Sequence, residues 1–426
     1  MTNTKEKTKF TPVGTIKWLF FDLNSFFASV EQQENKDLRG KPVAVVPMMT
    51  DGTCAIAASY EAKAYGIKTG TKIYEAKKMC PDLVCVLAKH DIYVKYHDWI
   101  MDEVENHTHI TKTYSIDEAA CELYSNENTP EKINQIARNI KQGLRDNVGE
   151  YIKCSIGAAQ NVFLAKLASD MQKPDGLTIL APNDYKDILF KQSLRSLTGI
   201  GAQTEKRLNH AGIYTIEQLW NIEPKHARKI WGNVAGEKFW YKLHGYEIPE
   251  ATTQKSVVGH SRVLDPEHRH PTLAFNITKQ LTIKAATRLR RCNLYARKFS
   301  LSVRSMNKTH WERYTSFSPA QDNFTFINSL ERMWHDMVID IGDTNLKKVS
   351  ITIHDLHERE QITMDLFGNN SIEEHNNSAL SSTIDAINKR FGKQAVTIGM
   401  HQKTAADHVG TKIAFTRIPE KEEFHE

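Results

Sequence analysis

Along the first 180 residues, apolar and polar positions switch between a two-residue and a helical period, which predicts strands and helices in turn. Residues 18–21 form an apolar, strand-favouring run, and residues 24–34 read as a helix with Asn24 or Ser25 as its N-cap. Further strands are predicted at 41–47, 54–59 and 112–124, and helices at 73–82, 93–110 and 130–149. This order is typical of a mixed α/β unit.

The pattern changes after residue 190. Residues 194–220 read as a helix, a Gly-Ile-Gly hairpin and a second helix ending at Gly212, and a polar linker is predicted at 249–256. Residues 298–306 and 347–356 alternate strictly, as half-buried strands with one polar face do. Before them an amphipathic helix carries Ile277, Leu281, Ala285 and Leu289 on one face and Lys284, Arg288 and Arg291 on another. After residue 357, strong periodicity returns only at 381.

Composition and charge narrow the class of protein. The chain has 426 residues, 40% hydrophobic and 25% charged, as expected of two to four globular units. No apolar leader or membrane-length run is present, and six scattered cysteines fit a reducing, cytoplasmic setting with no membrane partner.

The distribution of charge points to a polyanion. The net charge is only +5, but no Asp or Glu lies between His268 and Trp311. A solvated surface normally mixes signs, so a one-signed segment suggests a polyanionic partner. The basic residues of this acid-free segment are Arg269, Lys279, Lys284, Arg288, Arg290, Arg291, Arg297, Lys298, Arg304 and Lys308.

Three carboxylates are the strongest candidates for chemistry. Asp22 interrupts the apolar run at 18–21, and Asp117 and Glu118 are adjacent within the strand-like segment. Neighbouring strand residues point to opposite faces, so both acids can serve one site only at a strand end or hairpin. Three such carboxylates suit two Mg²⁺ ions, which prefer oxygen ligands and assist phosphoryl transfer. From spacing alone, a helix cap at Asp22 and a solvated turn at 117–118 fit equally well.

Four sequence motifs, in a fixed order along the chain, favour the metal site over the helix cap and solvated turn. The stretches "FFDLNSFFASVE", "ASYEAKAYGIKTG", "YSIDEA" and "FLAKLASDMQKPDG" resemble the Y-family translesion DNA polymerases of the DinB/UmuC type, over residues 16–356. The resemblance implies an α+β multidomain, right-hand-like polymerase. It would comprise a palm (1–22 and 91–178), small fingers (23–90), a helical thumb with a helix-hairpin-helix (179–248), a linker (249–256), an αβ little finger (257–357) and a C-terminal tail (358–426).

The resemblance also implies roles for individual residues. Asp22, Asp117 and Glu118 would be catalytic and would bind two Mg²⁺ ions, with the backbone carbonyl of Leu23 as a further ligand. Phe27 would exclude a 2′-hydroxyl from the sugar of the incoming nucleotide, since only that group separates RNA from DNA precursors. Phe26 would pack beneath the nucleotide, and the triphosphate would be held by Tyr60, Lys63 and Lys166. The alternative is that these residues have no role in binding: Phe26 would be an ordinary core residue, and the two lysines would be surface residues.

Several positions depart from the family pattern. Asn24 stands where many DinB-type members have Asp, and Lys63 where many have Arg. Val162 replaces a lysine, and Ala57 replaces a hydroxyl residue. Lysine offers a point charge rather than a bidentate fork, so the triphosphate grip should differ. Asn24 and Lys63 favour the UmuC branch and Tyr60 the DinB branch, which leaves the branch open.

Contacts to primer–template DNA are expected in two places. In the helix-hairpin-helix, glycines let backbone N–H groups approach a phosphate closely; the alternative is a plain tight turn. The little finger would lay a basic helix and polar strand faces on the duplex. The expected DNA-binding residues are Gly199, Ile200, Gly201, Thr204, Lys284, Arg288 and Arg291.

A short segment of the tail resembles the peptide by which bacterial polymerases dock on the sliding clamp. It is "QITMDLFG", in which Gln361, Met364, Leu366 and Phe367 would be the anchors. The alternative is that the segment packs back on the little finger. UmuD-like or recombinase accessory proteins are further possible partners.

The function implied is template-directed, Mg²⁺-dependent DNA synthesis of low fidelity and processivity from deoxynucleoside triphosphates, in translesion synthesis and DNA repair. One alternative is a catalytically inactive DNA-binding or accessory protein that retains the fold, which three intact acids disfavour. Another is a nucleotide cyclase, which would need neither a hairpin motif nor a basic C-terminal module.

Overall fold

A five-stranded sheet organises the N-terminal half of the chain. The computed structural model describes residues 11–249, 256–361, 372–391, 395–399 and 418. They form two compact units: residues 11–249 and 418 belong to the first, and the other described residues belong to the second. The sheet has the order β6-β7-β2-β8-β9, in which β2 is antiparallel to β7 and β8, and β8 is parallel to β9. Its strands are β2 (Trp18–Leu23), β6 (Lys112–Ser115), β7 (Glu118–Glu122), β8 (Cys154–Ala159) and β9 (Leu177–Ile179).

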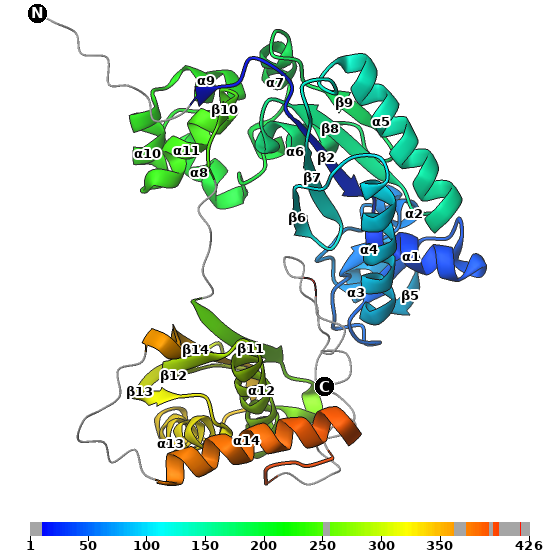
Figure 1. Ribbon diagram of the computed structural model, residues 1–426. Helices are drawn as coiled ribbons and strands as arrows, with labels where there is room; N and C mark the ends of the chain where they lie inside the picture. The colour runs from blue at the N-terminus through cyan, green and yellow to red at the C-terminus, as the bar shows by residue number, and fades with distance from the viewer. Residues whose placement is uncertain (1–10, 250–255, 362–371, 392–394, 400–417, 419–426) are drawn as a thin grey trace, which may run out of the picture. The chain divides into compact units, whose positions relative to one another are not determined.

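Helices cover both faces of this sheet (Figure 1). One face carries α4 (His90–Glu105) and α5 (Pro130–Gly143), and the other carries α6 (Val162–Met171). Phe20 points to the α6 face, where it packs with Leu164 and other core residues. By the alternation of a strand, Asp22 lies on this same face, at the end of β2.

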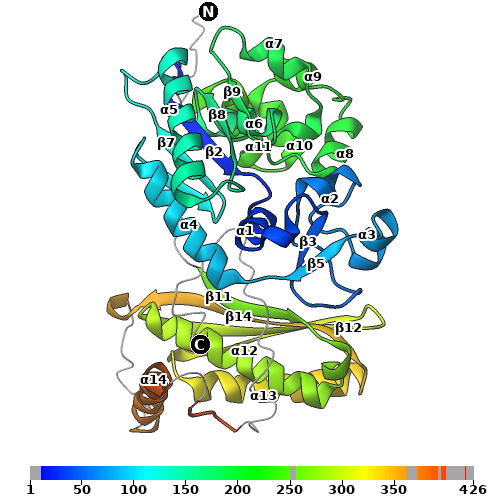
Figure 2. The ribbon, with the colours of Figure 1, turned by 90° about the vertical axis from the view of Figure 1, so that its right-hand side faces the viewer.

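A smaller three-stranded sheet adjoins the first (Figure 2). Its order is β4-β3-β5. Its strands are β3 (Val43–Val46), β4 (Ala57–Ala58) and β5 (Val84–Leu87), and the neighbouring helices are α1 (Phe26–Glu34), α2 (Tyr60–Ala64) and α3 (Ile73–Met79). Because α1 directly follows β2, the residues after Asp22 pass straight from the large sheet into this part.

A helical part follows the large sheet and shares its core. Leu197, Ile200 and Leu208 pack in the same apolar cluster as Phe20 and α6. Asn161 ties the parts together by donating to the carbonyls of Lys242, at 2.8 Å, and Tyr246, at 2.9 Å. The elements are α7 (Tyr185–Phe190), α8 (Ala202–His210), α9 (Ile216–Asn221), α10 (Pro224–Trp231), α11 (Val234–Leu243) and the strand pair β1 (Thr11–Pro12) and β10 (Tyr246–Glu247).

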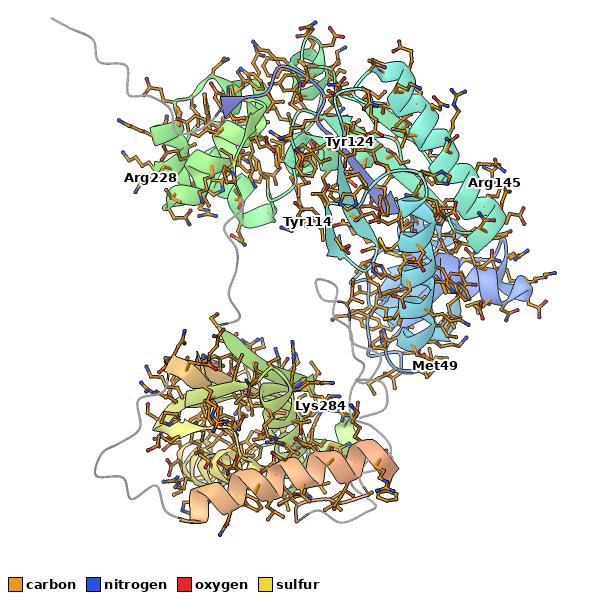
Figure 3. All side chains as sticks on the ribbon, in the orientation of Figure 1. Met49, Tyr114, Tyr124, Arg145, Arg228 and Lys284 are labelled. Atoms are coloured by element: carbon orange, nitrogen blue, oxygen red, sulfur yellow. The ribbon has the colours of Figure 1, made fainter. Side chains whose placement is uncertain are left out.

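The second unit is an antiparallel sheet with helices on one face. The sheet order is β11-β14-β12-β13, and the buried sides of its strands form one core with α12 and α13. Lys284 lies on α12 (Figure 3). The elements are β11 (Val257–Val263), α12 (Pro271–Arg291), β12 (Leu294–Ser305), β13 (His310–Ala320), α13 (Asn323–Ile341), β14 (Leu346–Glu358) and α14 (Ile372–Phe391).

Several details differ from the sequence expectations. Ser25 occupies the N-cap position of α1 with φ 50°, and its side chain does not cap the helix. The helix expected before the Gly-Ile-Gly turn is only a 3₁₀ turn, η3 (Leu194–Ser196), and the strand expected at 54–59 is two residues long. The helix expected at 130–149 ends at Gly143 and continues as a π-helical turn, η2 (Leu144–Val148).

The C-terminal helix begins nine residues before the periodicity predicts. Helix α14 starts at Ile372, and Ile384 and Ser381 on it are buried within the second unit, where α14 packs on α13. The remaining short turns are η1 (Lys36–Leu38), η4 (Pro266–His268) and η5 (Arg359–Gln361). In the part of the chain that the structure describes, no helix has the length and apolar character needed to cross a membrane.

Candidate active site

The three predicted acids meet at one rim of the large sheet. Asp22 on β2 stands directly opposite Glu118 on β7, so the two side chains share the α6 face. Asp117 lies in the turn between β6 and β7, where strand alternation is broken. Its backbone carbonyl accepts a hydrogen bond from the Leu23 amide at 2.8 Å. The hairpin expected from the adjacent acids is therefore confirmed.

Two lysines neutralise these acids. Lys173 Nζ lies 2.7 Å from Asp22 Oδ1 and also 2.7 Å from Asp170 Oδ1. Lys166 Nζ is ion-paired with Glu118 Oε1 and lies over the Phe20 ring, 5.3 Å from its centroid. Like charges directly opposite each other across a sheet repel. Each lysine therefore offsets part of the electrostatic repulsion between the two carboxylates.

Burial dominates the electrostatics of the site. Asp22 is only 7% exposed, and burial raises the pKa of its carboxyl to about 7, although the Lys173 ammonium opposes the shift. Burial likewise raises the pKa of Asp117, against a 2.5 Å hydrogen bond from the Ser115 hydroxyl. Both carboxyls are thus poorly solvated, and a cation close to them would stabilise their charged forms.

These donors fit divalent cations. Carboxylate oxygens at a strand end, with a main-chain carbonyl beside them, are the hard ligands that Mg²⁺ prefers. As the side chains stand among the described residues, no three His, Cys, Asp or Glu groups are close enough to share an ion. Asp22 and Glu118 are each engaged by a lysine instead, so a metal ion would have to displace the ammonium groups.

Tyr60 and Lys63 lie within the electrostatic reach of this centre. Ser59 caps α2 by accepting a hydrogen bond from the Ala62 amide, which fixes the start of the helix. Lys63 Nζ lies over the Tyr60 ring, 4.4 Å from its centroid. Burial and the neighbouring Lys173 charge both lower the pKa of Lys63. Two ammonium groups therefore converge on the acids, an arrangement that suits a polyanionic ligand.

The pair of phenylalanines begins α1, immediately after the acid. Phe26 and Phe27 are 4% and 7% exposed, with ring centroids 5.7 Å apart. Phe27 stacks on Tyr93 of α4, whereas Phe26 meets Tyr93 edge-on. Both rings are therefore buried, and Phe27 has the closer contact with Tyr93.

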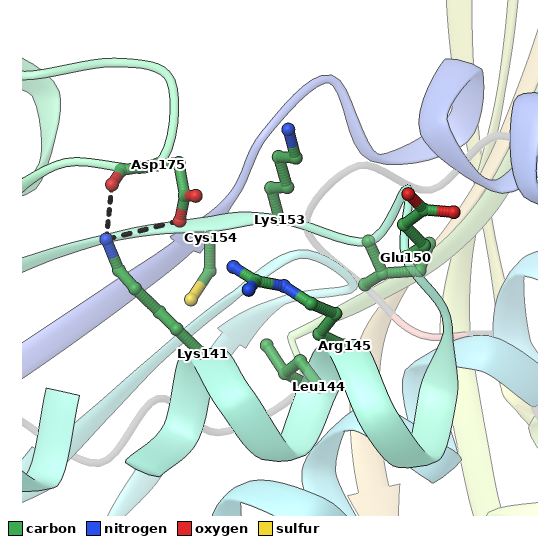
Figure 4. Close-up of a pocket in the computed structure, with 8 residues that line it drawn as sticks. Lys141, Leu144, Arg145, Glu150, Lys153, Cys154 and Asp175 are labelled. Atoms are coloured by element: carbon green, nitrogen blue, oxygen red, sulfur yellow. Dashed lines mark hydrogen bonds and ion pairs between the residues drawn. The ribbon is translucent and has the colours of Figure 1, made fainter. Parts of the chain in front are cut away.

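Lys173 is the main residue that the sequence interpretation missed. It follows α6 in the turn "QKPDG", which residues behind the site hold in place. Asn24 Oδ1 accepts a hydrogen bond from the Asp175 amide at 2.7 Å, and Asn24 Nδ2 donates to Ser155 Oγ at 3.0 Å. On the other side Lys141 Nζ bonds Asp175 and the Gly176 carbonyl, next to a small pocket (Figure 4).

The expected DNA-binding residues are differently exposed. Gly199 has φ 95°, which only glycine adopts readily, and Gly201 is exposed at the start of α8, where no side chain caps the helix. Ile200 is 4% exposed, so only its backbone can reach a ligand. The Thr204 hydroxyl accepts a hydrogen bond from Arg207 at 3.4 Å.

In the fold, acidic residues from other helices lie beside some of the basic residues of the acid-free segment. Arg290 is held by Asp385 of α14, with Nε 2.6 Å from Oδ2, and Lys279 pairs with Glu331 of α13 at 3.3 Å. Lys298 and Arg304 instead alternate with buried residues of β12, so they lie on the outer, helix-free face of its sheet. Lys284 and Arg288 are half-buried on α12, and Arg291 is exposed.

Of the expected clamp-binding residues, only Gln361 lies in the described part of the chain, where it is exposed. Met364, Leu366 and Phe367 lie outside the described residues.

Comparison with known proteins agrees with this geometry. Residues 21–170 match the model of the impB/mucB/samB family, and residues 255–366 match the model of that family's C-terminal domain. The DNA polymerase IV of Moorella thermoacetica is 33% identical over 302 residues, which cover 69% of this chain and 74% of that protein. That of Oceanobacillus iheyensis is 27% identical over 412 residues, covering 93% and 94%.

Solved structures show the same fold. A Y-family DNA polymerase chimera of Dbh and Dpo4 superposes with a TM-score of 0.69 at 23% identity, over 80% of this chain and all of that one. DinB from Sulfolobus solfataricus gives a TM-score of 0.51 at 24% identity over the same shares. The predicted right-hand-like α+β architecture is thereby confirmed.

The relatives and the family models together define a DNA-directed DNA polymerase. Within that class, the chain belongs to the impB/mucB/samB family, the Y-family polymerases of the DinB type. The resemblance found in the sequence is therefore confirmed.

The loop that carries Lys173 provides a test of how the site is built. Replacing Asn24 with alanine removes the acceptor of the Asp175 amide and leaves Ser155 short of a donor, both in a buried setting. We expect faster amide hydrogen exchange across residues 172–176 and a loss of about 1–3 kcal/mol in the free energy of unfolding. Hydrogen exchange by mass spectrometry and urea unfolding measure the two effects.

Asn35→Ala is the matched control, because Asn35 Oδ1 also accepts a backbone hydrogen bond, from the Asp37 amide at 2.9 Å, but at an exposed turn. Exchange at 172–176 should be unchanged in that variant. Equal exchange in Asn24→Ala and wild type would show that Asn24 does not hold the loop.

Proposed function

We propose that this polymerase carries out template-directed, Mg²⁺-dependent synthesis of low fidelity and processivity, in translesion synthesis and DNA repair. The observation that carries the proposal is the pair Asp22 and Glu118, opposite each other at the sheet rim with Asp117 in the adjoining turn. Two divalent cations held by them would lower the barrier to phosphoryl transfer by stabilising the attacking and leaving oxygens.

In this proposal the acids and lysines exchange partners when substrate arrives. Asp22, Asp117 and Glu118 would hold the cations together with the Leu23 carbonyl. Lys173, no longer paired with Asp22, would be available with Lys63 to bind the incoming triphosphate, as would Tyr60 through its hydroxyl. Lys166 is freed from Glu118 in the same way. The ammonium groups act as point charges, which suits a flexible triphosphate.

Phe27 is the proposed sugar gate. It is the second residue of α1, four positions beyond Leu23, so a nucleotide on the acids would present its sugar to this ring. Because a rigid ring occupies the space that a 2′-hydroxyl would need, the site would reject a ribonucleotide by steric exclusion. Phe26, turned further into the core, supports it.

The proposed DNA contacts follow from exposed backbone and charge. The uncapped start of α8 at Gly201 offers free N–H groups to a phosphate. Lys298 and Arg304 on the outer sheet face add charge, and Lys284, Arg288 and Arg291 on α12 remain candidates. The part around the three-stranded sheet, with its short helices α2 and α3, corresponds to small fingers, which favour tolerance over fidelity.

Binding to a sliding clamp would keep this weakly processive polymerase on its template. We include docking of Gln361, Met364, Leu366 and Phe367 on a sliding clamp in the proposal, with the boundaries of palm, fingers, thumb and little finger given above. Accessory proteins of the UmuD or recombinase type remain possible partners. A cytoplasmic location is part of the same proposal, because deoxynucleotides and a replicating template must be at hand.

The competing proposal is an inactive protein that keeps the fold for DNA binding. Primer extension with the purified chain and Mg²⁺ separates the two, and the acid variants sharpen the result. Asp117→Ala or Glu118→Ala should abolish extension, because a remaining pair of carboxylates cannot hold two ions. DNA binding, measured by fluorescence anisotropy, should change little.

Glu122→Ala is the control, since Glu122 lies on the same strand and its carboxylate forms a partly exposed ion pair with Lys17, at 3.0 Å. Such pairs contribute at most about 1 kcal/mol, so extension should be retained. Extension at the wild-type rate by Glu118→Ala would remove the metal assignment.

The sugar gate predicts a change in substrate choice. Phe27→Ala should incorporate ribonucleotides at least about a hundredfold more readily relative to deoxynucleotides, because the excluded volume is gone. The ratio of kcat/KM for the two triphosphates in single-nucleotide incorporation measures this. Phe26→Ala should shift the ratio far less. If Phe27→Ala discriminates as sharply as wild type, another residue is the gate.

A further inference from the structure

The ring of Phe27 contacts two aromatic side chains of α4. Tyr93 stacks on it, with centroids 4.4 Å apart and planes inclined by 16°, and His90 meets it edge-on at 6.2 Å and 85°. Tyr93 itself is fully buried. A ring with a flat partner on one face and an edge contact on another has one favoured plane, because a rotation would lose both contacts.

Tyr93 is in turn fixed by a buried carboxylate. Its hydroxyl donates to Glu31 Oε1 at 2.7 Å, and the Lys89 ammonium lies 2.9 Å from Glu31 Oε2. Glu31 is only 1% exposed, and a buried carboxylate keeps its partners because an unpaired charge there is costly. Burial and Glu31 raise the pKa of the Tyr93 phenol above its usual value, so the donated proton stays in place.

Phe27 and Glu31 are four residues apart on α1 and therefore share one face of that helix. Tyr93 contacts both: its ring stacks on Phe27 and its hydroxyl bonds Glu31. The three side chains form a frame, because a rotation of the Tyr93 side chain would break its stack on Phe27 and its hydrogen bond to Glu31. A second tie joins the same helices, from the Tyr96 hydroxyl to Glu34 Oε1 at 2.6 Å, but the Tyr96 ring packs on Trp99.

We propose that Tyr93, held by Glu31, is a positioning residue for sugar selection: it fixes the plane of the Phe27 ring. The inference rests on the proposed role of Phe27 as the gate. The gate must tell a hydrogen from a hydroxyl, a difference of about one atom, so displacement of the ring on the order of 1 Å would open it. Excluding a hydroxyl therefore requires a ring that does not move, and Tyr93 supplies the restraint.

The test compares two substitutions at one site with a matched control. Tyr93→Phe keeps the stack and loses the bond to Glu31, whereas Tyr93→Leu keeps bulk and loses the flat partner. Tyr96→Phe removes the same kind of tyrosine–glutamate bond between the same helices without touching Phe27. The readout is the ratio of kcat/KM for deoxy- and ribonucleoside triphosphates, with thermal unfolding as the check on folding.

The expected order of this ratio is wild type, then Tyr93→Phe, then Tyr93→Leu, the last at least about tenfold below wild type. Tyr96→Phe should match wild type. The efficiency with deoxynucleotides should fall much less than the ratio, which separates positioning from general damage. In a Phe27→Ala background, Tyr93→Leu should change the ratio no further, because Tyr93 acts through Phe27.

Three results would overturn the inference: an unchanged ratio in Tyr93→Leu, an equal loss with both substrates, or a lower ratio that persists in the Phe27→Ala background. Should Tyr93→Leu fail to fold, Tyr93→Phe decides, because a ratio equal to that of Tyr96→Phe would contradict the frame. Failure of the gate itself is seen separately, as an unchanged ratio in Phe27→Ala alone.

Discussion

Two like charges facing each other across a sheet govern the rest of this structure. Asp22 and Glu118 occupy opposed positions on β2 and β7, in a setting buried enough to raise the pKa of Asp22 to about 7. Such a pair is tolerated only with cations beside it, and Lys173 and Lys166 supply them. In the proposed function, divalent ions would replace these ammonium groups beside the acids, and the lysines would then be available for phosphates.

The surroundings serve this centre in layers. Asn24 and Ser155 hold the turn that carries Lys173, and Lys141 grips the same turn from behind. On the other side, α1 carries Phe27 away from the acids, and Tyr93 and Glu31 restrain its ring. Buried polar contacts therefore fix the positions of Lys173 and Phe27. The parts expected to contact DNA, in contrast, are exposed backbone and charged surface side chains.

The sequence predicted the acids and their hairpin because strand alternation leaves adjacent carboxylates no other way to share a face. It missed Lys173, because a lysine in a turn after a helix reads as surface, and only the fold brings it to Asp22. For a related reason it could not show which basic residues of the acid-free segment are paired: Asp385 and Glu331, which neutralise Arg290 and Lys279, come from helices later in the chain. The local sequence pattern predicts helices, strands and turns. Ion pairs between residues far apart in the chain depend on the topology of the fold, which this pattern does not give.

Competition between lysine and metal at Asp22 is the central claim, and calorimetry tests it most directly. Titration of Mg²⁺ or Mn²⁺ into the protein without DNA should show roughly tenfold tighter binding to Lys173→Met than to wild type, because a charged hydrogen bond of about 1.5–3 kcal/mol no longer has to be broken. Lys132→Met, an exposed lysine on α5, which covers the opposite face of the sheet, should bind as wild type does. Equal or weaker binding by Lys173→Met would contradict the account.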